Sequence, residues 1–509
     1  MTLTHRPAAI PTLLSLALLA LYLAFPTKVY YWDGITFAQA IEDAAAPSPS
    51  LAHPNHLLYN FAGYYFYRLL RLSGFELRAV TALQVLNSVL SAACATILFL
   101  ILRNTLRSIY LAVCLTLLFA LSATWWKFST DANAYIPSVF FLLVSFYLVL
   151  PERKPAPLLL ALSFVAAMCF HQLAVVAFPV FALGVYLQNG SIPIKHRLVN
   201  AATFSVAAFV LIVFVYALVF YLATGAVDIG RFWRWTVSYS PDAETGFDFW
   251  SNLGYSMRGQ VRLFFGGRLN LLRGLMGPGV VLLLTMLVVA VALLIFAFVW
   301  NLPKFGSRLR RSRLLPRQKT VVLLALVWTG VYLVFLFFWL PQNTFYRLFY
   351  LPAFIILLGL ALAALAHTAS RRTFATALFV AAVGLANFLF LIYPFTHVEK
   401  YPPLAFALRM NREWPPGTVV YYAADSSDKG LIRYFNPATH WSRQQPTDRD
   451  LANVYSAGRT AWLETTAIDQ LSASAEGRRW LETHARPDSL RELNDGAHRL
   501  RFIQIVPRP

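Results

Sequence analysis

The chain has 509 residues, of which 58% are hydrophobic and only 13% are charged, and its mean hydropathy is +0.57. A soluble domain of this length needs far more charge, so the composition predicts an integral membrane protein. Most of the net charge of +20 lies before His397, where 28 basic residues stand against ten acidic ones. Cytoplasmic loops of membrane proteins concentrate charge in this way, so nucleic acid is excluded as the expected partner.

Eleven apolar stretches before Pro394 predict transmembrane helices. They run roughly over Ala9–Phe25, Ala79–Leu102, Ile109–Thr124, Ala134–Leu150, Leu158–Phe170, Ala174–Leu187, Ala201–Thr224, Gly279–Trp300, Val321–Leu340, Phe345–Ala366 and Phe374–Tyr393. With the N-terminus in the cytoplasm, five basic turns face inward, as the positive-inside rule requires. The richest turn, Lys304–Lys319, has seven basic residues and no acid. Two large loops, about residues 26–78 and 225–278, then lie on the outer face.

The apolar stretch Leu158–Leu187 tests this topology. As one helix it would be about 45 Å long, too long for a hydrocarbon core of about 30 Å. Counting it as one span would also place the turn Lys304–Lys319 outside. We therefore predict two short helices that meet at Phe170-His171-Gln172 on the outer face and pack against the rest of the protein.

Residues 397–509 are predicted to form a soluble extracytoplasmic domain after a transmembrane domain over residues 1–396. The turn Trp414–Gly417 precedes an apolar strand at Thr418–Tyr422, a helix is expected near Ile468–Thr483, and Phe502–Val506 alternates as a closing strand. The predicted fold class is mainly α: a polytopic helical membrane protein with a small C-terminal α/β domain.

Polar residues gather in four groups on the predicted outer face, in a part of the chain where acids are rare. In chain order they are Asp33; His53 with His56; Lys127 with Asp131; and Tyr346 with Arg347, while His171 lies at the tip of the hairpin on the same face. An ionisable group at a membrane face is by default a functional-site hypothesis. Structural alternatives stay open: His53 and His56 as loop or cap residues, Asp131 as the N-cap of the fourth span, and Arg347 as an arginine that extends to the interface.

These side chains suit the transfer of a group from a lipid-linked phosphate. A carboxylate can act as a base toward an acceptor hydroxyl, and Lys127, Arg347 or the histidines can neutralise a phosphate leaving group. The three cysteines lie in apolar runs, which indicates buried small side chains and not a disulfide framework or a metal site. No Walker sequence, dinucleotide fingerprint or His-Glu-x-x-His motif is present.

Over about residues 10–395 the chain resembles the GT-C superfamily of polytopic glycosyltransferases, and within it the bacterial proteins similar to protein O-mannosyltransferases. The resemblance rests on Y-Y-W-D-G-I-T-F after the first span, H-P-N-H-L-L-Y in the same loop, W-W-K-F-S-T-D-A-N-A-Y in the next outer loop, and F-H-Q at the hairpin tip. It implies that Asp33 matches the catalytic base, Asp131 the acid of the second outer loop, and Arg347 a residue for the donor phosphate.

Two departures from the family pattern bear on these assignments. Gly34 follows the first acid where several subfamilies carry a second acid, which puts metal dependence in question. The second motif reads D-A-N-A-Y, so Asp131 is offset from the usual position two residues before the tyrosine. No cofactor is expected as certain, and a divalent cation, Mg²⁺ or Mn²⁺, stays open.

The resemblance implies an inverting glycosyltransferase at the outer face of a bacterial plasma membrane, with a polyprenyl-phosphate-sugar donor and a protein, lipid or glycan acceptor. The candidate substrate-binding residues, chosen for their chemistry and their place on the outer face, are His53, His56, Lys127, His171, Tyr346 and Arg347. The competing classes are a transporter, a flippase or polymerase of lipid-linked glycans, and a catalytically silent scaffold. The span centres are nearly free of charge, with Gln84, Asn87 and Asn387 as the main polar exceptions, which favours chemistry at one face over passage through the centre.

Overall fold

The computed structural model describes residues 9–106, 108–188, 192–237, 248–300, 315–364, 369–424, 427–494, 496 and 499–508. Most of the predicted basic turn Lys304–Lys319, up to Leu314, lies outside these residues. The chain divides into two compact units. The first comprises Met1–Thr27 and Ala40–Pro394, and the second comprises Lys28–Gln39 and Phe395–Pro509.

The first unit is helical. Its longer helices are α1 (Ala9–Ala24), α3 (Tyr59–Leu72), α4 (Ala79–Leu106), α5 (Ile109–Ala120), α6 (Ala123–Ser129), α7 (Tyr135–Leu148), α8 (Pro157–Phe170), α9 (Phe178–Leu187), α10 (Ile194–Thr224), α11 (Ile229–Val237), α12 (Phe249–Phe264), α13 (Pro278–Trp300), α15 (Pro316–Trp339), α16 (Leu351–Ala364) and α17 (Ala369–Asn387). Short turns of helix lie between them: η2 (Pro49–Leu51), η3 (Pro54–His56), η4 (Gln172–Ala177), η5 (Leu269–Leu272), η6 (Phe345–Phe349), η7 (Phe388–Ile392) and α18 (Tyr393–Phe395).

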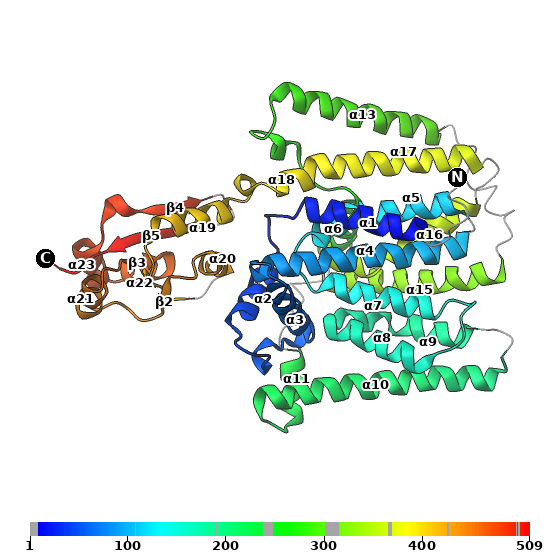
Figure 1. The fold of residues 1–509 in the computed structure, drawn as a ribbon, viewed down its shortest axis with the longest axis horizontal. Coiled ribbons are helices and arrows are strands. Elements are labelled where there is room, and N and C mark those ends of the chain that lie inside the picture. Colours follow the sequence, from blue (N-terminus) through cyan, green and yellow to red (C-terminus); the bar gives the residue numbers. More distant parts are fainter. Residues whose placement is uncertain are drawn as a thin grey trace. The chain divides into compact units, whose positions relative to one another are not determined.

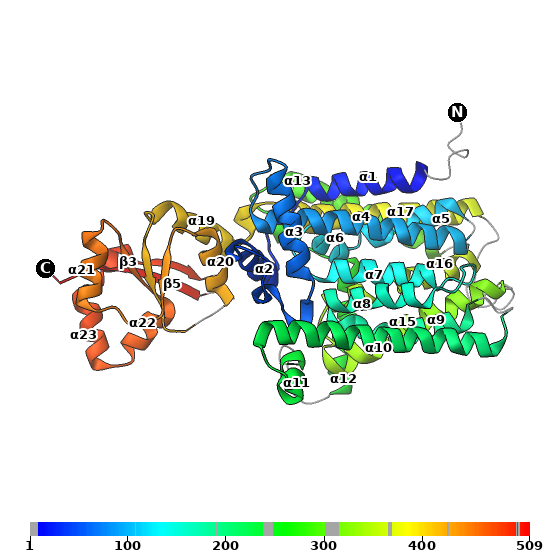
Figure 2. The ribbon, with the colours of Figure 1, turned by 60° about the horizontal axis from the view of Figure 1, so that its bottom comes forward.

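Most of these helices run side by side, and α4 lies among them in contact with α1, α5, α7 and α16 (Figures 1 and 2). Each of the eleven predicted spans contains helix, although several include a few non-helical residues, such as Leu121 and Ser122 between α5 and α6. By length and composition, four described helices could cross a bilayer alone: Ala79–Leu106, Ile194–Thr224, Pro316–Trp339 and Thr373–Phe395. The pair α5 and α6, bent by 68°, would make a fifth. Six further apolar stretches of helix have 10–17 residues, counting α13 only over Pro278–Val289.

The predicted break of the stretch Leu158–Leu187 into two short helices is confirmed. Helix α8 ends at Phe170, because His171 adopts an extended conformation with φ −159° and ψ 124°. The chain then turns through η4 into α9, and Pro179 at the start of α9 suits the first turn of a helix. Helix α8 packs against α7 and α10, so these short helices lie against protein, as their length requires.

The second unit contains a five-stranded sheet in the order β2-β1-β3-β5-β4. Its strands are β1 (Val419–Tyr421), β2 (His440–Ser442), β3 (Ala461–Glu464), β4 (Arg491–Asn494) and β5 (Arg499–Ile505). Strands β2, β1 and β3 are parallel, whereas β5 is antiparallel to β3 and β4. The predicted strands at Thr418–Tyr422 and Phe502–Val506 are therefore confirmed as β1 and the end of β5.

Helices cover both faces of this sheet, because alternate strand residues point to opposite sides. Val420, Trp462 and Phe502 belong to a core with α19 (Pro402–Glu413) and α20 (Ser427–Phe435). Tyr421, Leu463 and Ile505 belong to a second core with α21 (Asp448–Ser456), α22 (Thr465–Ser472) and α23 (Ala475–His484).

The helix predicted near Ile468–Thr483 is two helices. Helix α22 ends at Ser472, and α23 starts anew because the Ser474 hydroxyl accepts a hydrogen bond from Gly477 N at 2.9 Å. A Cβ atom on Gly477 would lie 2.1 Å from the Leu471 carbonyl oxygen, so the tight corner requires glycine.

Helix α2 (Trp32–Asp43), which begins in the Lys28–Gln39 segment of the second unit, carries Asp33 in its first turn.

Candidate functional site

Asp131 lies between α6 and α7, and its side chain is completely buried. Its Oδ2 atom pairs with Lys127 Nζ, which comes from one turn earlier in the chain. Its Oδ1 atom accepts a hydrogen bond from Ala132 N at 2.9 Å. The Lys127 side chain is 15% exposed, whereas that of Asp131 is completely buried, so the cation of the pair is the more accessible partner.

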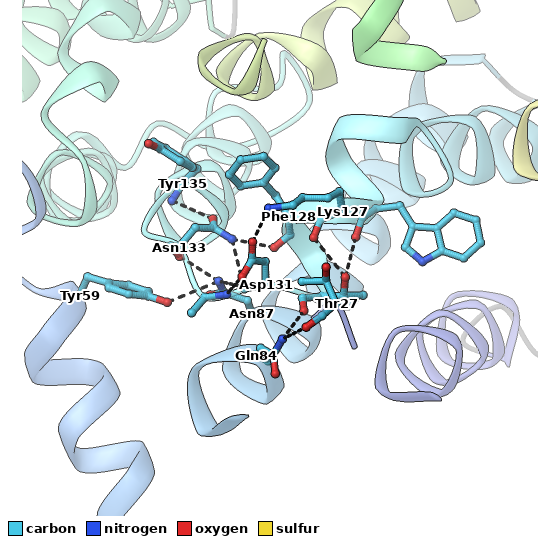
Figure 3. Close-up of polar contacts among 12 residues, drawn as sticks. Thr27, Tyr59, Gln84, Asn87, Lys127, Phe128, Asp131, Asn133 and Tyr135 are labelled. Atoms are coloured by element: carbon cyan, nitrogen blue, oxygen red, sulfur yellow. Dashed lines mark hydrogen bonds and ion pairs between the residues drawn. The ribbon is translucent and has the colours of Figure 1, made fainter. Parts of the chain in front are cut away.

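Polar side chains of α4 hold the loop around Asp131, and Figure 3 shows Gln84 and Asn87 among them. Asn87 Nδ2 donates to Asp131 O at 2.7 Å and to Asn133 O at 2.9 Å. Gln84 Nε2 donates to Thr130 O at 3.0 Å and to Thr27 O at 2.8 Å, and Ser88 Oγ donates to Ser129 O at 3.0 Å. These side chains satisfy buried carbonyl groups that the loop cannot pair within regular structure.

The cap of α7 is Asn133 and not Asp131. Asn133 Oδ1 accepts from Tyr135 N and Ile136 N, both at 3.2 Å. The alternative that Asp131 caps the fourth span is therefore wrong. The Asp131 carboxylate instead pairs with Lys127.

The three predicted histidines meet in one ring cluster. The His56 ring lies 5.3 Å from that of His53 and 4.7 Å from that of His171, centroid to centroid. The Tyr135 ring lies 5.0 Å from His171 and 5.8 Å from Tyr346, and the His171 and Tyr346 rings are 5.7 Å apart. We call these five residues the histidine–tyrosine cluster.

Burial keeps His53 and His56 neutral. It lowers the pKa of His53 to about 4, and burial together with the nearby His53 lowers the pKa of His56 to about 3. His171 Nδ1 accepts a hydrogen bond from Leu173 N at 3.1 Å. The neutral ring of His171 therefore carries its proton on Nε2, which can donate to an acceptor.

Aromatic contacts join the Lys127–Asp131 pair to the histidine–tyrosine cluster. Lys127 Nζ lies 4.7 Å from the centroid of the Phe128 ring, and the Phe128 and Tyr135 rings are 5.6 Å apart. The structure thus brings together His53, His56, Lys127, Asp131, His171 and Tyr346, which come from separate loops of the sequence.

Arg347 lies in a separate polar cluster. Its side chain is only 1% exposed, so the alternative that it extends to the interface is wrong. Its Nη1 donates to Tyr350 Oη at 2.9 Å and its Nη2 donates to Pro341 O at 2.7 Å, while Tyr350 Oη donates to Gln260 Oε1 at 2.7 Å. The guanidinium packs on Gly259, where a Cβ atom would lie 2.4 Å from Arg347 Nε.

No carboxylate pairs with Arg347 among the described residues, and its buried Nε has no acceptor there. Gln260 Nε2 is a second buried donor without an acceptor in the same part of the structure. Burial of a cation costs several kcal/mol of folding free energy in lost hydration unless an anion compensates the charge. The cluster of Arg347, Gln260 and Tyr350 therefore has the composition of an anion site.

Asp33 lies in the second unit, at the second residue of α2. Its side chain is half-buried. Burial raises the pKa of the Asp33 carboxyl above its ordinary value, and a hydrogen bond with the Tyr31 side chain opposes this rise. Asp33 is thus a stronger base than a solvated aspartate.

The described residues do not fit a bound divalent cation. No group of three or more His, Cys, Asp or Glu side chains in this part of the chain is arranged to hold a metal ion. Both carboxylate oxygens of Asp131 are engaged, by Lys127 and by Ala132 N.

Sequence reasoning missed Asn133, Tyr135, Gln260 and Tyr350 as site residues. Tyr135 stood in the D-A-N-A-Y motif, and Asn133 two residues before it, so their position was visible although their roles were not. Tyr350 lies three residues after Arg347, but Gln260 had no local signal, because it joins these two residues only through the packing of α12 against η6. Gln84 and Asn87 were visible as polar residues in an apolar span.

The structure is similar to solved membrane proteins. ArnT from Cupriavidus metallidurans bound to undecaprenyl phosphate matches with a TM-score of 0.61 and 11% sequence identity over 97% of both chains. The same protein in the apo state matches with a TM-score of 0.59 and 12% identity, again over 97% of both chains. An oligosaccharyltransferase from Archaeoglobus fulgidus gives a TM-score of 0.48 and 12% identity over 98% of this chain and 72% of that chain.

No protein-family model matches the chain, and no curated protein matches its sequence. ArnT belongs to the GT-C superfamily, so the comparison confirms the GT-C fold that the sequence resemblance predicts. The chain is a multi-pass helical membrane protein with a small sheet in its C-terminal part.

Proposed function

We propose that this protein is an inverting glycosyltransferase that moves a sugar from a polyprenyl-phosphate donor to an acceptor hydroxyl at the outer face of a bacterial plasma membrane. The observation that carries the proposal is the buried Arg347 guanidinium without a carboxylate partner among the described residues. An anionic ligand would compensate this charge, and arginine presents a planar set of donors that matches phosphate oxygens.

The fold supports a lipid-linked phosphate as that anion. ArnT, which has the same fold, was crystallised with undecaprenyl phosphate. Arg347 lies in η6, which connects the apolar helices α15 and α16. An isoprenoid chain in the bilayer could therefore bring its phosphate to Arg347. Tyr350 accepts a hydrogen bond from the guanidinium and donates one to Gln260, whose Nε2 is a further donor in the same cluster.

The other cationic and proton-donating groups suit the leaving phosphate. Lys127 is fixed by Asp131 and by the face of the Phe128 ring. His171 Nε2 carries a proton in the neutral ring, and its neighbours are aromatic side chains on which a sugar can stack. His53, His56 and Tyr346 would shape the same surface.

The reaction needs a base for the acceptor, and Asp33 takes this role in the proposal. Asp33 removes the proton as the acceptor oxygen forms a bond to the anomeric carbon. The bond between that carbon and the donor phosphate oxygen breaks, and polyprenyl phosphate leaves with the electron pair. Direct displacement of this kind inverts the anomeric configuration.

The polar residues of α4 weaken the competing transporter hypothesis. Substrate and ion pathways place polar side chains deep in the spans. Gln84, Asn87 and Ser88 are polar, but each donates to backbone carbonyl groups of the loop around Asp131 or to Thr27. Their role is therefore to hold a loop, and they add nothing to the case for a pathway.

The test is sugar transfer in proteoliposomes from a panel of radiolabelled polyprenyl-phosphate sugars. We expect one donor to be used by the wild type, and Arg347→Ala to lower the rate about 100-fold or more, the loss seen when one charge-stabilising donor is removed. Arg347→Lys should recover part of the activity, because it restores charge without the planar fork.

The matched control is Arg258→Ala, since Arg258 is exposed on α12, the helix that also carries Gln260. This variant should retain wild-type transfer. Absence of transfer by the wild type with every donor would move the assignment to a transporter or assembly protein. Full activity of Arg347→Ala would remove Arg347 from the donor site.

A further inference from the structure

The segment that carries Asp33 is part of the same compact unit as the C-terminal domain. This unit joins Lys28–Gln39 to Phe395–Pro509, which are far apart in the sequence. Lys28 N donates to Phe395 O at 2.6 Å. The Tyr30 ring stacks on the Phe435 ring, with centroids 5.9 Å apart and planes at 28°. Tyr30 is 8% exposed, so this contact is an interior one.

The core of the C-terminal domain fixes the position of Phe435. Phe435 is the last residue of α20 and packs against the core that contains Val420, Ile432 and Phe502. Asn436, the next residue, is buried and donates through Nδ2 to Ile432 O at 2.8 Å and to Ala407 O at 3.0 Å. The end of α20 is therefore fixed by both packing and hydrogen bonds, and it offers Tyr30 a rigid surface.

The path from Tyr30 to Asp33 is short and ordered. Gly34 N donates to Tyr31 O at 2.9 Å, which closes the first turn around Asp33. The Tyr31 side chain hydrogen-bonds the Asp33 carboxyl. A displacement of the backbone at Tyr30 would therefore move both the carboxyl and the group that orients it.

We propose that Phe435 is a positioning residue for the transfer reaction: through its stack on Tyr30, the C-terminal domain holds the segment Lys28–Gln39 so that Asp33 can act on the acceptor. This inference rests on the proposed role of Asp33. It gives the C-terminal domain a part in catalysis, because the domain supplies the surface against which the catalytic segment is held.

The activity test compares Phe435→Ala, Phe435→Tyr and Leu493→Ala in the full chain. Leu493 packs against the same core as Phe435 but lies on β4, so it serves as the matched control for loss of packing. Phe435→Ala should lower kcat roughly ten- to a hundredfold with an unchanged KM for the donor, since misplacement of a catalytic group by about 1 Å has effects of this size. Phe435→Tyr should retain activity, and Leu493→Ala should keep the wild-type kcat.

A second measurement separates this inference from the proposed function. Hydrogen exchange followed by mass spectrometry needs no substrate, and Phe435→Ala should accelerate exchange in peptides that cover Lys28–Gln39, whereas Leu493→Ala should not. Unchanged exchange there in Phe435→Ala would overturn the inference even if the enzyme transfers sugar. Accelerated exchange in Phe435→Ala, in a protein whose wild type transfers no sugar, would show that Phe435 holds the segment Lys28–Gln39 but would refute the proposed reaction and with it the catalytic part of the inference. Equal kcat values for Phe435→Ala and Leu493→Ala would also overturn it.

Discussion

A carboxylate acts as a base only when it is deprotonated, so the pKa of Asp33 determines the acid limb of the proposed reaction. Burial raises this pKa above the ordinary value for aspartate. We therefore expect kcat/KM to fall, on acidification, at a higher pH than a solvated aspartate would give. The measurement is kcat/KM for sugar transfer over a pH series from about 4 to about 8.

Two controls accompany this pH profile: a second acid on α2, the helix of Asp33, and two histidines of the first unit. Asp43 is exposed on α2, so Asp43→Asn should leave the acid limb unchanged, whereas Asp33→Asn should abolish transfer. His53 and His56, with pKa values lowered to about 4 and about 3, stay neutral above pH ~5 and cannot produce a limb there. A profile that is flat down to the pH of an ordinary aspartate would contradict the assignment of Asp33 as base.

The Lys127–Asp131 pair predicts a strong non-additive effect on stability. Lys127→Met would leave a completely buried carboxylate without its cation, which costs about 3–5 kcal/mol of folding free energy. The double variant Lys127→Met with Asp131→Asn removes both charges, so it should be more stable than Lys127→Met alone. Thermal unfolding of the purified protein in detergent measures both effects, and a double variant as unstable as the sum of the single ones would argue against a coupled pair.

At the residue scale, the sequence predicted several functional groups but not their partners. Lys127 and Asp131 were visible because charges are rare in the apolar part of the chain. The burial of Arg347 was not visible, since it depends on Gly259 and Gln260 from another helix. The capping role of Asn133 was also hidden, because Asp and Asn have similar preferences for helix N-termini.

At the scale of elements, the corner between α22 and α23 depends on one glycine. A Cβ atom on Gly477 would lie 2.1 Å from Leu471 O, so Gly477→Ala should force the two helices apart and cost about 1–3 kcal/mol, as overpacking does. The matched change is Gly430→Ala in α20, where no atom lies within 4 Å of the added Cβ. That change should be neutral or stabilise the domain by up to about 1 kcal/mol.

The readout for this pair is hydrogen exchange of the C-terminal peptides in the full chain, together with its thermal unfolding. Faster exchange over α22 and α23 in Gly477→Ala, with no such change in Gly430→Ala, is the expected result. Equal effects of the two substitutions would show that the close approach at Gly477 does not limit the stability of the domain.

Apolar runs and length limits predicted most elements, and local capping explains the main differences. The break at His171 followed from the length of the apolar stretch, which is too great for one span. The break between α22 and α23 was not predicted, because it depends on the Ser474 cap and on the contact at Gly477. The bend of 68° between α5 and α6 was not predicted either, and it lies inside a single predicted span. Apolar composition does not indicate the direction of a helix axis.

At the scale of the whole molecule, sequence patterns placed Lys28–Gln39 in the loop after the first span. The structure assigns this segment to the unit that contains Phe395–Pro509. The association depends on the Tyr30–Phe435 stack and the Lys28–Phe395 hydrogen bond, which join residues far apart in the chain. Composition and hydropathy patterns predict local structure only, so they do not predict a contact between residues that are hundreds of positions apart, such as Tyr30 and Phe435.

The orientation in the membrane remains a prediction, and the chain offers a direct way to measure it. Cys94, Cys114 and Cys169 are buried, so the wild type should react weakly with a membrane-impermeant maleimide. Glu152→Cys would place a thiol in the exposed turn between α7 and α8, expected in the cytoplasm. Leu490→Cys would place one in the C-terminal domain, where Leu490 is 44% exposed.

We expect intact spheroplasts to label Leu490→Cys and to label Glu152→Cys only after permeabilisation. The pair also tests the hairpin, because seven predicted spans lie between the two positions when α8 and α9 cross separately. If the stretch Leu158–Leu187 were one span, the number would be six and both thiols would face the same side. Labelling of both from one side would therefore refute the two-helix hairpin as a pair of crossings. Labelling of Glu152→Cys alone in intact spheroplasts would place the C-terminal domain inside and remove the basis for chemistry at the outer face.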